Sequence, residues 1–335
     1  MDSSLISIIY LVLGIVLLVY SGDYLVKGAT AIANHFKISS LVIGLTVVAF
    51  GTSAPELIVS LDAAVTGHPE IALGNVIGSN IANIALVLGL TVLILPMPVA
   101  QQTIKRSWPI MFVSGIVLYV SMQNNMVGHI EGILMFIALV LFIISSIKSS
   151  KRFPVNINIP KPANKYPVWA YFVMVIIAST GLAFGSRLLV NGASSLAAEL
   201  GISERIISIT IVAFGTSLPE LTASVIAATK KETDVSVGNL VGSNIFNVFA
   251  VIGITSGIHV IDFSFAEFRV DLHFMMIIYT LLFLFIVPWK QIFSKENRGN
   301  SVVGRYKNIR ESVISRAEGG ALFVLYIGYI LLLFK

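Results

Sequence analysis

Ten apolar stretches, each close to the length of a membrane-spanning helix, run through almost the whole chain. A helix needs about 20 apolar residues to cross the hydrocarbon core of a bilayer. Hydrophobic residues make up 56% of the 335 residues and charged residues only 12%, whereas a soluble domain carries about a quarter charged residues. The sequence therefore predicts an all-α, polytopic membrane protein. The predicted spans are approximately 5–26, 41–65, 71–95, 108–123, 131–148, 168–190, 205–228, 236–258, 272–288 and 320–334.

The Lys and Arg residues fall mostly in alternate loops, which predicts the orientation of the chain. With the N-terminus outside the cell, 18 of the 22 Lys and Arg residues lie on the inner side and 4 on the outer side. Cytoplasmic loops carry an excess of these residues, so we expect a multi-pass protein of the plasma membrane with both termini extracellular. The basic loops also account for the net charge of +5, and we expect no nucleic-acid partner.

The chain contains two copies of one unit. Residues 42–89 align with 206–253 at an offset of 164, and 23 of the 48 positions are identical. The identities concentrate in AFGTS-PEL and in GN--GSNI-N, and a repeat of this length indicates a duplicated unit. Because each copy has five predicted spans, we expect two inverted five-helix repeats, 1–148 and 168–335, joined by a cytoplasmic linker at 149–167.

The first copy of AFGTS-PEL places a proline and a glutamate inside a predicted span. Pro55 has no N–H, and its ring crowds the carbonyl four residues back, so we expect the helix to break there. The carbonyls freed near Ala49 need a partner at membrane depth, and a bound cation is one such partner. Thr52, Ser53 and Glu56 add two hydroxyls and a charge on one helical face. The seventh span repeats this pattern with Ala213, Thr216, Ser217, Pro219 and Glu220.

A second polar stripe lies on the next span of each half. Asn75, Ser79 and Asn83 follow one another at intervals of four residues, which puts them on one face of a helix. For the stripe alone, hydrogen bonding between helices and ion binding are equal alternatives. Next to a carboxylate and a broken helix, ion binding is the favoured interpretation. The equivalent residues of the second half are Asn239, Ser243 and Asn247.

The repeated glutamates, Glu56 and Glu220, predict a shared site with a charge of −2. A charge at the centre of a spanning helix costs on the order of 3 kcal/mol on insertion scales, which indicates a functional role. Carboxylate, carbonyl and hydroxyl oxygens without thiol or imidazole suit Ca²⁺, and they also suit Na⁺. Asp62 lies six residues beyond Glu56 on a different face, and we expect it to be a vestibule or helix-end acid rather than a ligand.

GTSAPEL and GTSLPEL, each followed by GN--GSNI-N, resemble the two alpha repeats of the Ca²⁺/cation antiporter superfamily, especially the prokaryotic sodium/calcium exchangers. The resemblance implies a secondary active antiporter that exchanges Na⁺ for Ca²⁺ by alternating access. It also implies that the first and sixth spans form a sliding gate, and that Glu56 and Glu220 are the main carboxylate ligands. The other ligands that it implies are Thr52, Ser53, Ser79, Asn83, Thr216, Ser217, Ser243 and Asn247, with the backbone carbonyls of Ala49 and Ala213.

One departure from the family pattern leaves an alternative open. Some members carry Asp where this chain has Asn247, which weakens any case for K⁺ cotransport and leaves proton coupling open. An H⁺-coupled antiporter of Ca²⁺ or another divalent cation is therefore the alternative. The repeat argues against a channel, and no Ser–His, HExxH or paired-Asp pattern supports an enzyme. We expect no cofactor, Na⁺ and Ca²⁺ as transported substrates, the lipid bilayer as solvent, and a site that one monomer can complete.

Overall fold

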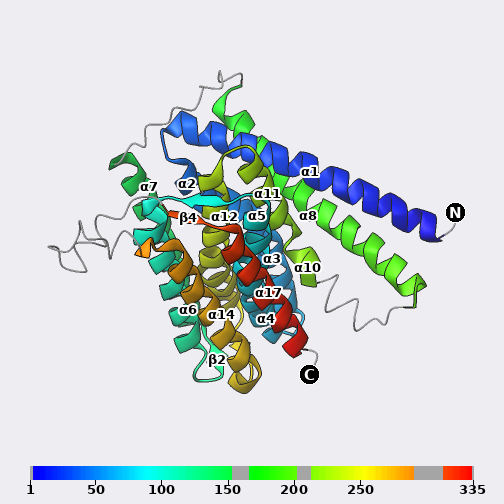
Figure 1. Cartoon of the computed structure of the whole chain (residues 1–335). Coiled ribbons are helices and arrows are strands. Elements are labelled where there is room, and N and C mark those ends of the chain that lie inside the picture. The colour runs from blue at the N-terminus through cyan, green and yellow to red at the C-terminus, as the bar shows by residue number, and fades with distance from the viewer. Residues whose placement is uncertain (1–2, 153–165, 202–212, 290–311, 334–335) are drawn as a thin grey trace.

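The computed structural model describes residues 3–152, 166–201, 213–289 and 312–333, and helices dominate this part of the chain (Figure 1). Eight helices in the described residues are long and apolar enough to cross a membrane. The predicted all-α membrane fold is therefore present, with eight such helices rather than ten. They are Leu5–Phe36, Ser40–Val65, Glu70–Ile94, His129–Ser150, Val168–Glu199, Thr233–Ile258, Phe265–Ile286 and Arg316–Leu333.

The predicted fourth and seventh spans are not among these eight. The fourth corresponds to a shorter helix, Trp108–Ser121. The seventh is described only from residue 213 onward, and its predicted part at 205–212 lies outside the described residues. The first and sixth helices are longer than predicted, at 34 and 32 residues.

Several membrane helices are built from consecutive segments of α-helix and π-helix, the latter marked η. In chain order the helical segments are α1 (Ser3–Phe36), α2 (Ser40–Ile43), η1 (Gly44–Val48), α3 (Ala49–Val65), α4 (Glu70–Ile81), η2 (Ala82–Leu88), α5 (Gly89–Ile94), η3 (Thr103–Ser107), α6 (Trp108–Ser121), α7 (His129–Arg152), α8 (Val168–Glu199), α10 (Ala213–Thr216), α11 (Leu218–Thr229), α12 (Thr233–Phe246), η5 (Asn247–Ile252), α13 (Gly253–Ile258), α14 (Phe265–Ile286) and α17 (Arg316–Leu333).

Short strands tie together the loops at the ends of the helices. Strand β1 (Met97–Val99) pairs antiparallel with β4 (Ser312–Ile314), with Pro98 opposite Val313. Strand β2 (Met126–Val127) pairs antiparallel with β3 (Ile261–Asp262). Each pair connects the first half of the chain to the second.

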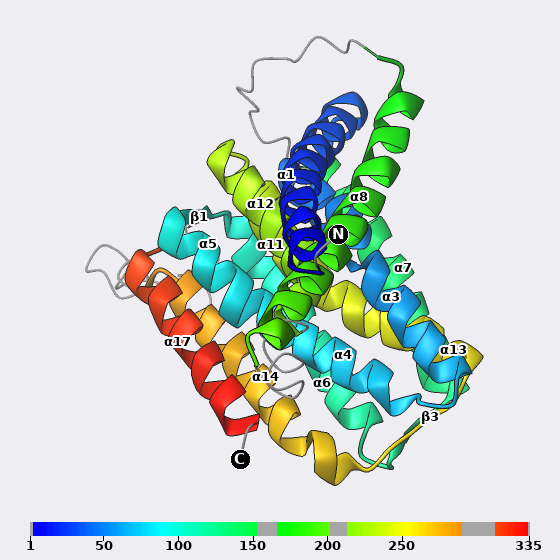
Figure 2. The same ribbon diagram turned by 90° about the vertical axis from the view of Figure 1, so that its right-hand side faces the viewer.

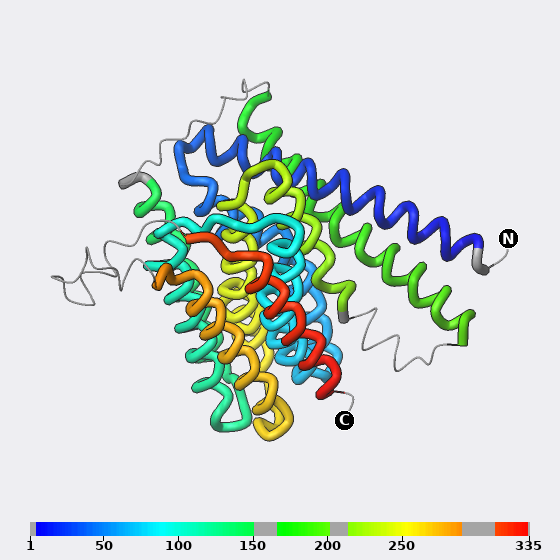
Figure 3. Tube along the Cα trace, in the orientation of Figure 1, coloured from blue at the N-terminus to red at the C-terminus, as the bar shows by residue number. Residues whose placement is uncertain are grey.

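Helices α1 and α8 form an antiparallel pair that lies obliquely along one side of the bundle (Figures 1 and 3). A Cβ added at Gly192 of α8 would lie 2.6 Å from the carbonyl oxygen of Ser7, and one at Gly28 of α1 would lie 3.3 Å from that of Tyr171. The two contacts are equivalent at the offset of 164 residues. Small residues thus let the first helix of each half pack closely around a local two-fold relation.

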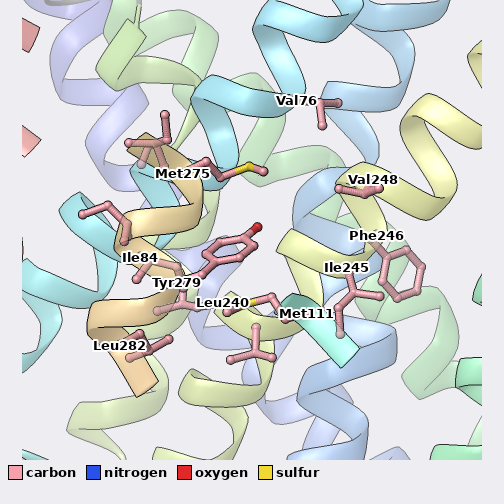
Figure 4. Packing of buried hydrophobic residues seen from close by; sticks show 14 of the residues in the cluster. Val76, Ile84, Met111, Leu240, Ile245, Phe246, Val248, Met275, Tyr279 and Leu282 are labelled. Atoms are coloured by element: carbon pink, nitrogen blue, oxygen red, sulfur yellow. The ribbon is translucent and has the colours of Figure 1, made fainter. Parts of the chain in front are cut away.

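The run α12–η5–α13 is the central helix of the bundle. In its most apolar stretch of 18 residues 94% of the residues are buried, compared with 28% in the corresponding stretches of α1 and α8. Figure 4 shows part of the surrounding apolar core, where Tyr279 of α14 packs near Leu240 of α12 and Met111 of α6. A helix with so little of its surface exposed can carry polar side chains only if other helices satisfy them.

Two glycines on α12 bring it into backbone contact with the first half of the chain. A Cβ at Gly238 would lie 2.6 Å from the carbonyl oxygen of Leu41, and one at Gly242 would lie 2.8 Å from Cα of Leu45. Such close approach requires residues without a Cβ. A Cβ at Gly78, the equivalent of Gly242, would meet no described atom within 4 Å. Close helix packing therefore explains these motif glycines in the second half only, as far as the described residues show.

The two repeated prolines occupy different positions in their helices. Helix α3 continues through Pro55 from Ala49 to Val65, so the predicted break in the second span is wrong. A proline removes only one hydrogen bond of the helix, and neighbouring helices can hold the axis continuous at membrane depth. In the second half, Ser217 separates α10 from α11, and Pro219 falls in the first turn of α11. There the missing N–H breaks no hydrogen bond, and the predicted break is present.

Candidate cation-binding site

Glu56 on α3 and Glu220 on α11 are two carboxylates buried inside the bundle. Glu56 is 2% exposed and Glu220 is fully buried. The hydroxyl of Ser53 donates to Oε1 of Glu220 at 3.4 Å, so a side chain of the first half reaches the carboxylate of the second. Oε2 of each glutamate has no hydrogen-bond partner among the described residues. Because an unpaired buried carboxylate is strongly unfavourable, these oxygens are suited to a cation.

Thr52 connects α3 to the polar face of α12. Its hydroxyl donates to Oδ1 of Asn239 at 3.1 Å and lies 3.3 Å from the hydroxyl of Ser243. The same hydroxyl lies 3.3 Å from the carbonyl oxygen of Ala49. Thr52, Asn239 and Ser243 are all buried. Hydroxyl, amide and carbonyl oxygens from both halves therefore gather in one cluster.

The first asparagine of each repeated GN motif makes the same contact in the two halves. Asn75 donates to the hydroxyl of Ser60 at 3.0 Å, and Asn239 donates to that of Ser224 at 3.1 Å. These residues are equivalent at the offset of 164. Asn75 also donates to the carbonyl oxygen of Glu56 at 3.2 Å. The two amides thus hold α4 and α12 against the helices that carry the glutamates.

Both polar stripes end where the α-helix gives way to a π-helix. Asn83 is the second residue of η2, and Asn247 is the first residue of η5. Short π-helical segments are frequent at functional sites. Among the described residues, Asn83 has no partner for either side-chain amide atom, and Asn247 has none for its oxygen. Each buried asparagine therefore presents an amide oxygen that a ligand can use.

Two further asparagines, which we did not predict as site residues, complete the contact between the halves. Asn80 accepts a hydrogen bond from Asn247 at 3.1 Å and donates to the carbonyl of Asn244 at 3.4 Å. Asn244 accepts a hydrogen bond from the hydroxyl of Tyr279 at 2.9 Å. The available signal was their identity in both copies of GSN. We did not select them because each follows the serine of the stripe and so lies on a different helical face.

The remaining predicted ligands lie on the same segments. Ser79 of α4 and Ser217 are buried, and the Ser217 hydroxyl has no hydrogen-bond partner within the described part of the chain. Thr216 is exposed and lines a cavity beside Glu56. Ala213 is the first residue of α10. Hydrogen bonds thus join Thr52 and Ser53 of the first half to Ser243 and Glu220 of the second, and Thr216 lines the same cavity as Glu56. For Ser79, Asn83, Ser217 and Ala213 the described part of the chain shows the position along the helices but no hydrogen bond to this cluster.

A cavity of about 180 Å³ reaches this cluster from one side of the bundle. Glu56, Asn75 and Thr216 line it, together with Ser186 and Arg187 of α8. The cavity reaches Glu56 although this side chain is almost fully buried. Glu56, Asn75, Ser186 and Thr216 supply oxygen atoms to its lining, and hard cations such as Na⁺ and Ca²⁺ prefer oxygen ligands. The cationic residue Arg187 lines the same cavity.

A bundle of membrane-spanning helices around buried carboxylates, with equivalent residues of a repeat facing one site, defines the class of membrane transporters for cations. Comparison with known proteins places the chain within this class. A family model described as sodium/calcium exchanger protein matches residues 6–148 and 170–335. The chain therefore belongs to the sodium/calcium exchanger family of cation antiporters.

Individual relatives resemble the chain over nearly its whole length. CaxA of Alkalimonas amylolytica, named as a candidate antiporter, is 37% identical, and the match covers 99% of each chain. The sodium/calcium exchanger MaX1 of Methanosarcina acetivorans is 27% identical over 98% of this chain and 99% of the relative. A solved structure of the sodium-calcium exchanger NCX_Mj superimposes with a TM-score of 0.76 at 32% identity, covering 97% of this chain and 98% of the other.

Proposed function

We propose that this chain exchanges Na⁺ for Ca²⁺ across the membrane by exposing one central site alternately to each side. The observation that carries the proposal is the buried pair Glu56 and Glu220, each with one carboxylate oxygen that lacks a partner among the described residues. Family membership supports an antiporter of cations. NCX_Mj, the similar solved exchanger, has been soaked with Na⁺ together with Ca²⁺ or Sr²⁺.

The frame of the transporter is a pair of inverted five-helix repeats, 1–148 and 168–335, with 149–167 as the linker between them. Helix α6 and the segment 205–228 supply the two spans beyond the eight that length and composition identify. Two observations support this arrangement. The family model matches the chain in two separate segments, and equivalent residues of α1 and α8 make equivalent contacts across their antiparallel interface.

The transported ions bind between the two halves. Glu56 and Glu220 supply the charge, and the short contacts of Thr52 and Ser53 to residues of the second half bring the other oxygens close to them. The proposed ligands are Glu56, Glu220, Thr52, Ser53, Ser79, Asn83, Thr216, Ser217, Ser243 and Asn247, with the carbonyls of Ala49 and Ala213.

Charge balance explains why an exchange is needed. Two carboxylates neutralise one Ca²⁺, so the loaded site changes sides with no net charge. The empty and ionised site would keep two buried negative charges, which hydrocarbon strongly opposes. Monovalent cations must therefore occupy it on the return. The cluster offers more oxygen ligands than protonation of two carboxylates requires, which favours Na⁺ over H⁺.

The protein resides in the plasma membrane with both termini outside, because this orientation puts 18 of its 22 Lys and Arg residues on the cytoplasmic side. All proposed ligands come from one chain, so a monomer is sufficient for transport. In this orientation α1 begins outside and α8 begins inside.

Purified protein in Ca²⁺-free vesicles tests the proposal. We expect an outward Na⁺ gradient to drive Ca²⁺ uptake. A K⁺-diffusion potential, positive inside, should speed this uptake, because more than two Na⁺ leaving for each Ca²⁺ that enters moves net positive charge outward. Vesicles with equal Na⁺ on both sides are the control. Uptake that follows a pH gradient and needs no Na⁺ would overturn Na⁺ coupling in favour of the H⁺-coupled alternative.

A further inference from the structure

Helix α1 packs against α11 through an apolar contact, and an ion pair joins the two helices beside this contact. A Cβ at Gly22 would lie 2.7 Å from Cδ1 of Ile226, so the two helices touch there. In the next position of α1, the carboxylate of Asp23 forms ion pairs with Lys230, which follows α11, and with Lys27 at 2.7 Å. Figure 2 shows α1 passing beside α11. Asp23 and Lys230 therefore fasten the helix pair to the second half of the bundle.

In the other half a cavity takes the place of this contact, although α8 touches α3 further along, where a Cβ at Gly51 would meet the hydroxyl of Ser179. At the offset of 164, Ser186 and Arg187 of α8 correspond to Gly22 and Asp23 of α1. Both α8 residues line the cavity opposite Val59 of α3, whereas their α1 counterparts are packed on α11. The cavity thus lies between α8 and α3 at the positions where the equivalent helices, α1 and α11, are in contact.

Repeat equivalence identifies the residues that would meet if this cavity closed. Ile226, which touches Gly22, corresponds to Asp62 on α3. Asp62 lies three residues beyond Val59, so it is on nearly the same face, one helical turn further from Glu56. Closing α8 on α3, as α1 is closed on α11, would bring Ser186 to Asp62 and place Arg187 beside it.

The charges near these positions are complementary. The helix pair carries an acid at Asp23 and a base at Arg187. Lys230, the partner of Asp23, corresponds to Thr66, and Asp62 lies one helical turn before Thr66 on α3. Arg187 and Asp62 are both exposed, and neither takes part in an ion pair within the described part of the chain. Each is available to the other.

We propose that Arg187 and Asp62 form an ion pair that holds α8 against α3 in the opposite transport state, when the Asp23–Lys230 pair is open. This inference rests on the proposed alternating access, and it gives Asp62 a role that does not involve contact with the transported ion. We refer to the Asp23–Lys230 and Arg187–Asp62 ion pairs as the two fasteners. Each forms in one transport state and lies near one end of the α1–α8 pair.

The expected strength of each ion pair suits a protein that must change state repeatedly. The side chains of Asp23 and Lys230 are each 30% exposed, and a partly exposed ion pair changes an equilibrium by about two- to fivefold. Loss of one fastener should therefore shift the ratio of the two states by this factor. Stronger fasteners on one side only would trap the transporter, because both states must be populated for turnover.

Cysteine cross-linking tests the proposal directly, because the natural chain has no cysteine. One variant carries Asp62→Cys with Arg187→Cys, and the other carries Asp23→Cys with Lys230→Cys. A short bifunctional thiol reagent is applied to full-length protein in Na⁺, in Ca²⁺ and in neither ion. We expect the two cross-links to respond reciprocally, with the 62–187 yield rising wherever the 23–230 yield falls. A 62–187 yield that stays at background while the 23–230 yield changes would refute the proposal.

Removing or exchanging the charges of Asp62 and Arg187 gives a second test. It distinguishes a specific ion pair from a general effect of charge. In the 23–230 cysteine background, Asp62→Asn should raise the cross-link yield by about two- to fivefold. Asp62→Arg combined with Arg187→Asp should return it to the starting value. Glu70→Gln is the matched control, since Glu70 is another partly exposed acid near the same end of α3. An equal shift from Glu70→Gln would overturn the pairing.

A separate measurement on the same proteins tests the proposed function. Na⁺-driven Ca²⁺ uptake of the uncross-linked chain tests the exchange reaction. Reciprocal cross-links without such uptake would support the fasteners and refute Na⁺/Ca²⁺ exchange. Normal uptake with no 62–187 cross-link under any condition would support the exchange and refute the fastener.

Discussion

Replacing Glu220 by Gln is the most informative change to the site. Glu220 is fully buried, and Oε2 of its carboxylate has no partner among the described residues. Glutamine keeps the size and an oxygen ligand but removes half of the proposed charge of −2. The change therefore separates the charge of the site from its shape.

The size of the effect follows from the burial of the carboxylate. Removing one partner of a buried charge pair costs about 3–5 kcal/mol, which corresponds to a loss of about 100- to 4,000-fold in Ca²⁺ affinity. At a Ca²⁺ concentration 100 times the original dissociation constant, the ligand stabilises the unmodified protein by about 2.7 kcal/mol. For the variant, the same concentration should contribute less than about 0.4 kcal/mol.

The assay is thermal unfolding in detergent with and without Ca²⁺. We expect Ca²⁺ to raise the melting temperature of the unmodified chain and to leave that of Glu220→Gln almost unchanged. Without Ca²⁺ the variant should be at least as stable, because a buried unpaired charge has been removed. Ser53→Ala should have a smaller effect, about fivefold in affinity, since it removes one neutral donor at 3.4 Å from Glu220.

Two results would refute this reasoning. Full Ca²⁺-induced stabilisation of Glu220→Gln would show that the charge of Glu220 does not contribute to binding. An equal loss from the control Glu70→Gln, whose side chain is 44% exposed, would show that the effect is due to total charge. A variant that fails to fold is recognised by its melting curve without Ca²⁺.

Two further predictions concern topology and packing. A single cysteine introduced within 156–160 should resist an impermeant thiol reagent applied from outside intact cells, and rapid labelling there would reverse the proposed orientation. Gly242→Ala should destabilise the protein by about 1–3 kcal/mol, because its Cβ would lie 2.8 Å from Cα of Leu45. Gly328→Ala on α17 is the control, because its Cβ would meet no described atom within 4 Å; an equal loss of thermal stability from both variants would contradict the packing argument.

The sequence predicted the features that depend on local pattern. Long apolar runs predict helices in lipid because hydrocarbon leaves backbone groups no other partner than the helix itself. The repeat at an offset of 164 predicted that Asn75 and Asn239 occupy equivalent places, and their bonds to Ser60 and Ser224 agree within 0.1 Å. A carboxylate at Glu56 within an apolar span predicted an acid inside the bundle, and the structure buries it at 2% exposure.

Helix continuity could not be predicted from the same motif. Pro55 and Pro219 lie in motifs that differ only at the residue before the proline, Ala54 or Leu218, yet α3 passes through the first and a new helix begins just before the second. Proline removes one hydrogen bond in either case. Whether the axis then continues depends on the helices packed around it, and these differ between the two halves in this structure.

The sequence by itself determined the apolar helices of a membrane protein, the duplication and the two carboxylates within apolar spans. It also predicts oxygen ligands for the proposed site. Only the tertiary structure decided that Asn80 bonds to Asn247, that α1 is fastened to α11 through Asp23, and that the equivalent surface of α8 lines a cavity. The physical reason is the range of the interactions. Burial and helical periodicity are properties of neighbouring residues. Contacts between the two copies depend on how the halves are placed against each other, and two similar sequences can be placed in more than one way.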